Sequence, residues 1–132
     1  MRAEAAANVQ KPIRVLIADD HRLFAQALEA ILEADERIEV AGHARDGREA
    51  VELAASLDPD VILMDIAMPA MDGFQATRLI RKDDLRARVL MLTGSNSRSD
   101  VDRARKAGAV GYVTKDRIAA ELIDAIVEVV PD

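Results

Sequence analysis

The sequence contains no cysteine and no tryptophan among its 132 residues. Without cysteine the chain can form neither a disulfide framework nor a thiolate zinc site, and it offers no thiol nucleophile. Aromatic residues are almost as scarce, since Phe24, Phe74 and Tyr112 are the complete set. Three scattered rings exclude the stacked aromatic platform with which proteins bind single-stranded nucleic acid. The lack of cysteine also agrees with a reducing, cytosolic environment.

A surplus of basic residues is absent too, because 24 acidic side chains outnumber 18 basic ones and give a net charge of −6. This balance excludes a free-standing DNA or RNA binder, which needs a basic footprint. Apolar runs are short, whereas a membrane helix needs about 18 apolar residues in succession. The N-terminus lacks a secretory signal. With the length of one typical domain, the sequence predicts a cytoplasmic protein that binds no membrane.

The chain divides into a short polar start and one repeating body. Residues 1–12 lack apolar periodicity and end at Pro12, which predicts a flexible tail. Residues 13–130 form the predicted domain, and residues 131–132 are the start of a linker or the C-terminus. Within the domain, five short apolar runs alternate with segments of helical spacing. The runs cover residues 13–18, 38–41, 61–64, 89–92 and 110–113.

The segments between the runs predict helices. Asp46 can cap the second helix and the third begins near Asp72-Gly73, while the last runs from about Arg117. The fourth helix, residues 99–107, has Val101 as its only large apolar residue. It is therefore predicted to be held weakly, either as a plain surface helix or as a movable signalling face.

Five apolar runs without polar alternation predict strands that are covered on both faces. Because β–α–β crossovers are right-handed, five such units give an α/β fold with an open parallel sheet and helices on both faces. A closed eight-unit barrel would need about 250 residues. In an open sheet of this kind, ligands bind at the carboxyl ends of the strands, where the winding reverses.

Polar residues stand at these carboxyl ends. The first run ends in Asp19-Asp20 and the third in Asp65, while Thr93 follows the fourth and Lys115 the fifth. Each has a structural explanation by itself, such as Asp20 as a helix cap. Together, three carboxylates repel, since two charges about 4 Å apart cost roughly 4 kcal/mol at an effective dielectric near 20. A cluster of oxygen ligands without sulfur predicts bound Mg²⁺, a common partner of phosphoryl groups.

The remaining groups suit phosphoryl transfer. Asp65, on the central strand, is the best-placed nucleophile and can form an acyl phosphate, which leaves Asp19 and Asp20 to hold the metal. Lys115 can neutralise one phosphoryl oxygen and Thr93 can donate a hydrogen bond to another.

From residue 13 to about residue 130, the chain resembles the receiver domain of bacterial two-component response regulators. The motifs that carry the resemblance are Ala18-Asp19-Asp20-His21, Met64-Asp65-Ile66-Ala67-Met68-Pro69, Met71-Asp72-Gly73, Leu92-Thr93 and Gly111-Tyr112-Val113-Thr114-Lys115-Asp116. The resemblance implies a flavodoxin-like fold with strand order 2-1-3-4-5. It also implies that a sensor histidine kinase is the partner that phosphorylates the domain.

The resemblance assigns roles residue by residue. Asp65 is the implied phosphoacceptor. The implied Mg²⁺ ligands are Asp20, Asp65 and the backbone carbonyl of Ala67, with Asp19 holding a metal-bound water. Thr93 and Lys115 would contact the phosphoryl oxygens. Tyr112 would be a switch whose ring turns inward when Thr93 moves toward the phosphate, with a half-buried strand residue as the less favoured alternative.

Several details resemble the NarL/FixJ branch, whose receivers usually precede a helix-turn-helix output domain that controls transcription. Asp116 follows Lys115 where many receivers have a cis proline, so a cis bond is not expected, and Asp116 could cap the last helix. Homodimerisation on phosphorylation is plausible through the helical faces. His21 is expected in a loop or first turn rather than as a ligand, because Mg²⁺ prefers oxygen, and His43 is expected to serve packing or the surface.

Three other functions remain open at this stage. The chain could be a stand-alone receiver that acts through protein–protein contacts, or a docking module that no longer takes phosphate. It could also be a phosphatase with an aspartate nucleophile, of the haloacid-dehalogenase type. Such enzymes place an Asp-x-Asp pattern on the first strand, whereas here that strand ends in adjacent aspartates. A receiver domain is not expected to be an enzyme, apart from catalysing its own phosphorylation and dephosphorylation.

Overall fold

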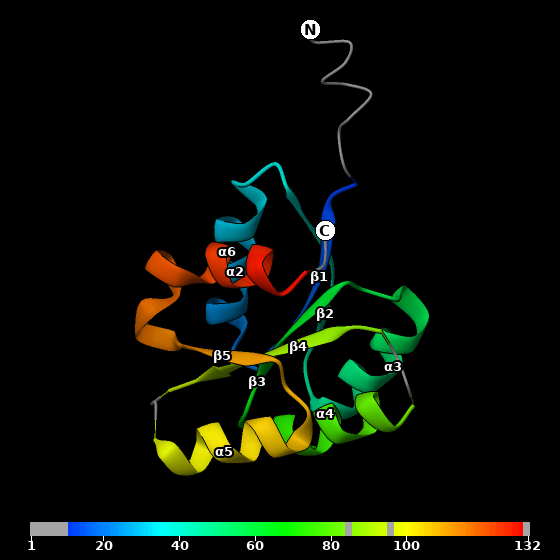
Figure 1. The fold of residues 1–132 in the computed structure, drawn as a ribbon. Coiled ribbons are helices and arrows are strands. Elements are labelled where there is room, and N and C mark those ends of the chain that lie inside the picture. The colour runs from blue at the N-terminus through cyan, green and yellow to red at the C-terminus, as the bar shows by residue number, and fades with distance from the viewer. Residues whose placement is uncertain (1–10, 84–85, 95–96, 131–132) are drawn as a thin grey trace, which may run out of the picture.

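The computed structural model describes residues 11–83, 86–94 and 97–130. Strands and helices alternate along the chain (Figure 1). They are β1 (Ile13–Ala18), α2 (Arg22–Glu33), β2 (Ile38–Ala44), α3 (Gly47–Leu57), β3 (Val61–Asp65), α4 (Gly73–Lys82), β4 (Arg88–Thr93), α5 (Arg98–Ala107), β5 (Gly111–Thr114), a 3-10 turn (Lys115–Arg117) and α6 (Ile118–Val129). The predicted tail, except Lys11 and Pro12, and the predicted linker start at 131–132 lie outside the described residues.

The five strands form one parallel sheet in the order β2-β1-β3-β4-β5. The α/β prediction and the strand order implied by the resemblance are both confirmed. The winding reverses at β1, which pairs with β2 on one side and with β3 on the other. The carboxyl ends of β1 and β3 therefore lie side by side at the reversal, where a ligand site is expected in this fold.

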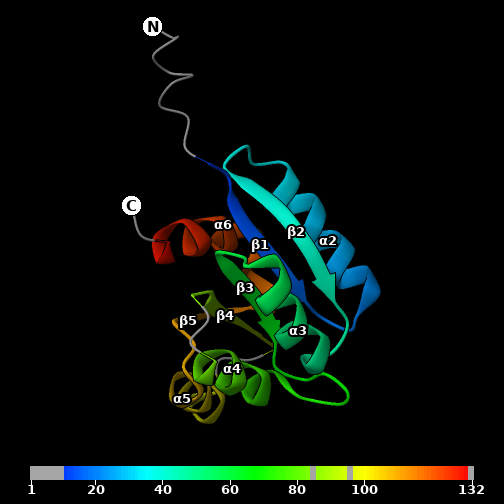
Figure 2. The same ribbon diagram turned by 90° about the vertical axis from the view of Figure 1, so that its right-hand side faces the viewer.

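Two apolar cores lie on opposite faces of the sheet. Helices α2 and α6 cover one face, and α3, α4 and α5 cover the other, as Figures 1 and 2 show. Successive residues of β1 alternate between them, with Val15 and Ile17 packed toward α2 and α6, and Leu16 and Ala18 toward the other three helices. Because β1, β3 and β4 are buried on both faces, their side chains near the carboxyl ends are held rigidly.

The edge strands depart from the predicted boundaries. β2 continues to Ala44, three residues beyond the predicted end, and its burial is mixed rather than complete. β5 runs one residue later than predicted. Full coverage holds for the three inner strands, whereas an edge strand has a neighbour on one side only, so polar residues such as His43 can extend it.

Helix caps confirm two predictions and correct two others. Asp46 accepts a hydrogen bond from the Glu49 amide at 2.8 Å, and Asp72 forms a capping box with Gln75. Asp20 does not cap α2, whose N-cap residue is His21. Asp116 does not cap the last helix either, because the chain passes through the 3-10 turn first and α6 begins at Ile118.

The Asp46 cap is open to a direct test. Asp46→Ala should lower the free energy of unfolding by about 1 kcal/mol, because the Glu49 amide loses its acceptor. Urea denaturation measures this change. Asp46→Asn is the matched control, since asparagine caps helices about equally well, and an equal loss in both variants would contradict the assignment.

Helix α5 buries little, as predicted. Its buried residues are Ala104 and Ala107, and it ends at Gly108, whose φ of 109° favours glycine. The guanidinium of Arg103 lies 4.1 Å from the ring centroid of Phe74 on α4 and supplies a cation–π contact. Among the described helices, α5 therefore buries the least apolar surface against the sheet, and little packing opposes its movement. Within the described ranges, no helix is long and apolar enough to cross a membrane.

Candidate functional site at the carboxyl ends of the strands

The structure brings the predicted site residues to one end of the sheet. Asp19 follows β1 directly, Asp65 is the last residue of β3, Thr93 ends β4 and Lys115 follows β5. Asp65 pairs in register with Leu92, so Thr93 stands one residue beyond it on the neighbouring strand. Asp19, Asp65 and Thr93 are each only 3% exposed, whereas Asp20 is exposed. The topology thus places two buried carboxylates next to each other.

Lys115 is the cation nearest to these carboxylates. Its Nζ lies 3.3 Å from Oδ1 of Asp65 and 3.8 Å from Oδ2 of Asp19. The same Nζ lies 4.6 Å from the ring centroid of Phe24 on α2, which holds the ammonium from the other side. One ammonium thus faces two buried carboxylates and leaves them with excess negative charge.

The charge imbalance shows in the two buried carboxylates. Oδ2 of Asp19 and Oδ2 of Asp65 are both buried, and neither has a hydrogen-bond partner among the described residues. Burial and the neighbouring charge of Asp19 raise the pKa of Asp65, against the opposing effects of Lys115 and a backbone hydrogen bond from Ala67. Buried, unpaired carboxylate oxygens cost folding energy, and a bound cation would recover it.

The backbone around the site fixes these side chains. The His21 amide donates to Oδ1 of Asp19 at 2.7 Å. After β3, the Gly73 amide donates to the Ile66 carbonyl at 2.8 Å. A Cβ at Gly73 would overlap the carbonyl oxygen of Asp65, so α4 begins directly against the Asp65 peptide. Gly73 therefore allows the loop after β3 to return against the Asp65 peptide.

His21 lies closer to the carboxylates than expected. Its position before α2 is as predicted, but its Nδ1 lies 3.4 Å from Oδ1 of both Asp19 and Asp20. It also lies 3.9 Å from Oδ2 of Asp65. One ligand atom from each of these four residues falls within 4.8 Å of the others. The donor set and the unpartnered oxygens therefore fit a divalent cation.

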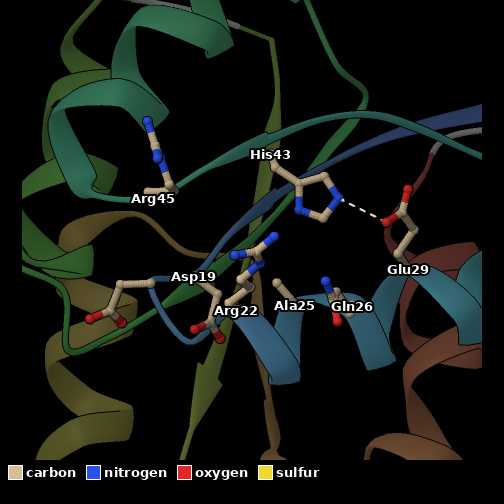
Figure 3. Close-up of a pocket in the computed structure, with 8 residues that line it drawn as sticks. Asp19, Arg22, Ala25, Gln26, Glu29, His43 and Arg45 are labelled. Carbon is tan, nitrogen blue, oxygen red and sulfur yellow. Dashed lines mark ion pairs between the residues drawn. The ribbon is translucent and has the colours of Figure 1, made fainter.

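A pocket of about 440 Å³ opens beside Asp19 and Asp20, between α2 and β2. Figure 3 shows His43 on β2 reaching across toward Glu29 on α2, and their Nε2 and Oε1 atoms are 3.3 Å apart. His43 is thus a surface residue with an ion-pair partner, which agrees with the prediction for it. Arg22 and Arg45 also line this pocket.

Tyr112 lies on β5 with 42% of its surface exposed. Together with Thr93 it lines a small apolar hollow that is too narrow to hold a water molecule, whose other walls include Ile66 and Met91 from the sheet side and Val101 from α5. The ring therefore stands at the edge of a hollow that also borders Thr93. A lysine–aspartate cis bond is absent as expected, since the described residues contain no cis peptide.

Comparison with known proteins identifies this arrangement. The family model of the response regulator receiver domain matches residues 15–127, which make up most of the chain. The chain belongs to the receiver domain family of response regulators. Its five-stranded fold is shared by solved receivers: the signal receiver domain of the putative response regulator NarL from Mycobacterium tuberculosis aligns with a TM-score of 0.87, at 34% identity over 90% of this chain and 96% of that one.

Curated relatives of this receiver domain are signalling proteins rather than metabolic enzymes. Transcriptional regulatory protein LiaR of Bacillus subtilis (strain 168) is 46% identical over 86% of this chain and 54% of its own length. Nitrate/nitrite response regulator protein NarL of Escherichia coli (strain K12) is 37% identical over 89% and 54%. The receiver domain thus spans about half of these relatives. Chemotaxis protein CheY of Halobacterium salinarum is instead covered over 95% of its length, at 40% identity.

Sequence reasoning missed two neighbours of the receiver site. His21 was set aside because Mg²⁺ prefers oxygen, and its place directly after Asp19-Asp20 was the available signal for a third polar group there. Nothing in the sequence indicates that the ring of Phe24 faces Lys115. Both contacts depend on the angle between β1 and α2, which the local sequence pattern does not determine.

Proposed function

We propose that this receiver domain is a phosphorylation-controlled switch in which Asp65 accepts a phosphoryl group from a sensor histidine kinase. One carboxylate oxygen of Asp65 forms a bond to phosphorus, and the phosphorus–nitrogen bond to the kinase histidine breaks. The imidazole leaves with the electron pair of that bond, and an acyl phosphate remains on Asp65. The main support is the buried Asp65 carboxylate, 3% exposed with an unpartnered oxygen and 3.3 Å from the Lys115 ammonium.

The residues that would hold Mg²⁺ are Asp20, Asp65 and the backbone carbonyl of Ala67, with Asp19 orienting a bound water. The unpartnered oxygens of Asp19 and Asp65 support this assignment. When bound, Mg²⁺ supplies positive charge that offsets the phosphoryl oxygens. Asp65 itself would orient toward both the ion and the incoming phosphorus.

Thr93 and Lys115 are the proposed phosphoryl-binding residues. The Lys115 ammonium already faces Asp65, and Thr93 stands on the neighbouring strand within the same buried region. A phosphoryl group adds nearly two negative charges and would draw both side chains toward it. Because Thr93 and Tyr112 border one hollow, a shift of Thr93 would change the space open to the tyrosine ring and to the weakly anchored α5.

The proposed output is control of transcription by a further domain or protein that responds to this surface, in the cytoplasm. LiaR and NarL, which are described as regulatory proteins and whose matched region covers 54% of their length, favour this output. A stand-alone receiver that acts through protein–protein contacts is the second candidate, favoured by the match over nearly the full length of the CheY protein. A homodimer formed on phosphorylation is compatible with either.

Phosphoryl acceptance is the direct test. The protein is incubated with Mg²⁺ and a small acyl-phosphate donor, and its intact mass is measured. We expect the added mass of one phosphoryl group on the wild-type protein and none on Asp65→Asn. Asp124→Asn, which changes an exposed aspartate on α6, is the matched control and should be phosphorylated normally.

Two results would refute the proposal. The first is an unmodified wild-type protein, which would favour a docking module that no longer takes phosphate. The second is an Asp65→Asn variant that still gains a phosphoryl group. Steady turnover of small phosphomonoesters would instead favour a phosphatase with an aspartate nucleophile.

A further inference from the structure

The ring of His21 has no hydrogen bond to any of the described residues that accounts for its position. Its Nδ1 lies 3.4 Å, 3.4 Å and 3.9 Å from oxygens of Asp19, Asp20 and Asp65. A hydrogen bond from nitrogen to oxygen is normally 2.7–3.2 Å long, so all three separations exceed this range. Three carboxylates nevertheless lie within 4 Å of one nitrogen of this side chain, which is 66% exposed.

These separations suit ligands that share one ion. Metal–nitrogen and metal–oxygen bonds are about 2.1 Å long, so neighbouring ligands of an octahedral ion stand about 3.0 Å apart and opposite ligands about 4.2 Å apart. The two 3.4 Å distances from Nδ1 of His21 exceed the spacing of neighbouring ligands by about 0.4 Å, and the 3.9 Å distance is about 0.3 Å shorter than the spacing of opposite ligands. The unpartnered Oδ2 atoms of Asp19 and Asp65 are further observations that a cation would explain.

The backbone also holds the His21 ring in this place. His21 is the N-cap residue of α2, with an extended backbone (φ −87°, ψ 101°), and its side chain makes no capping hydrogen bond. Its own amide instead fixes Oδ1 of Asp19 at 2.7 Å. The imidazole is therefore free of a helix-capping role and belongs to the same turn that orders Asp19.

We propose that Nδ1 of His21 is a metal ligand of this site, so that the receiver domain favours divalent transition-metal ions over Mg²⁺ more strongly than its carboxylates alone would. This inference rests on the proposed metal site and adds a nitrogen donor to it. Imidazole is a good ligand for borderline ions such as Co²⁺, Ni²⁺ and Zn²⁺, whereas Mg²⁺ prefers oxygen and keeps its waters. His21 thus acts as a specificity-determining residue.

The test compares the affinities of two ions rather than activity. Dissociation constants for Co²⁺ and Mg²⁺ are measured by calorimetry at pH 8 on the full chain without a purification tag. We expect His21→Ala to weaken Co²⁺ binding about 10-fold or more, since a nitrogen ligand is lost. Mg²⁺ binding should change by less than about 3-fold.

Two further variants keep the result interpretable. His21→Asn preserves a good N-cap residue and offers an amide oxygen, so it should lose the preference for Co²⁺ while the start of α2 stays intact. His43→Ala is the matched control, because His43 is the other histidine of the chain and pairs with Glu29 away from the carboxylates. It should leave both affinities unchanged.

The inference is overturned if His21→Ala leaves both affinities unchanged or shifts both by the same factor, since the ring would then act through charge or structure alone. Failure of the proposed function looks different. In that case the wild-type protein binds neither ion, or Asp65→Asn leaves Mg²⁺ affinity unchanged. A protein that binds Mg²⁺ through Asp65 and ignores the loss of His21 refutes the histidine ligand only.

Discussion

Asp65→Asn is expected to make the protein more stable when divalent ions are absent, by about 1–3 kcal/mol, although it should abolish the proposed phosphoryl acceptance. The wild-type carboxylate is 3% exposed and lies beside Asp19, and one of its oxygens has no hydrogen-bond partner among the described residues. An amide of the same shape removes that buried charge. Urea denaturation in the presence of a chelator measures the difference.

The stability gained by Asp65→Asn should depend on pH in a defined direction. Burial raises the pKa of Asp65 above its ordinary value of 3.8, so the folded state holds this proton more tightly than the unfolded state does. The resulting stabilisation is complete below the unfolded pKa and is lost as the pH rises through the folded pKa. The advantage of Asp65→Asn should therefore be largest near neutral pH and should shrink toward pH 4.

Mg²⁺ should reverse the order of stability. At about one hundred times the dissociation constant, a ligand that binds only the folded state adds about 2.7 kcal/mol. The wild-type protein should gain this amount and Asp65→Asn much less, whereas Asp124→Asn should behave as the wild type does. An equal gain from Mg²⁺ in all three proteins would place the ion elsewhere.

Lys115→Met is expected to destabilise the metal-free protein by about 1–3 kcal/mol. Removing one partner of a buried ion pair costs about 3–5 kcal/mol, and the smaller figure allows for the partial exposure of this lysine. Its Nζ is the cation 3.3 Å from Asp65 and 3.8 Å from Asp19. Methionine keeps much of the apolar stem but leaves both carboxylates without that charge.

The same variant should accept a phosphoryl group about 100-fold more slowly, because a positive group facing the transferred oxygens is lost. Time-resolved intact mass measures this rate. Lys106→Met, which changes an exposed lysine of α5, is the matched control and should alter neither property.

In an Asp65→Asn background, Lys115→Met should cost less stability than in the wild type. Additive effects would show that Lys115 and Asp65 do not interact.

The inner strands of the sheet were predictable because their continuous apolar runs already indicate buried strands, and the tertiary contacts agree with that pattern. The three inner strands are apolar on both faces, and the alternation with helical segments leaves few topologies to consider. The edges were less predictable, since Gly42, His43 and Ala44 at the end of β2 form no apolar run and join the sheet where β1 lies beside them. The last helix was placed about one residue early for a similar reason, as local capping preference cannot foresee a 3-10 turn after β5.

The residues of the candidate site were predictable to a comparable degree. Asp19, Asp65 and Thr93 end strands that a parallel sheet must bring together, so their convergence follows from topology. The ring of His21 and the contact between Phe24 and Lys115 depend instead on the angle at which α2 leaves β1. That angle arises from the packing of α2 against the sheet and leaves no local trace in the sequence.

The contact of Gly73 with the Asp65 peptide means that the two helices beside the site, α4 and α5, are packed with different tightness. On one flank, α4 abuts the peptide so closely that even a methyl group would not fit, and the capping box of Asp72 and Gln75 pins the start of that helix. On the other flank, α5 buries only two alanines. A force at Asp65 would therefore meet more resistance from α4 than from α5, and we expect the resulting displacement to occur toward β4, β5 and α5.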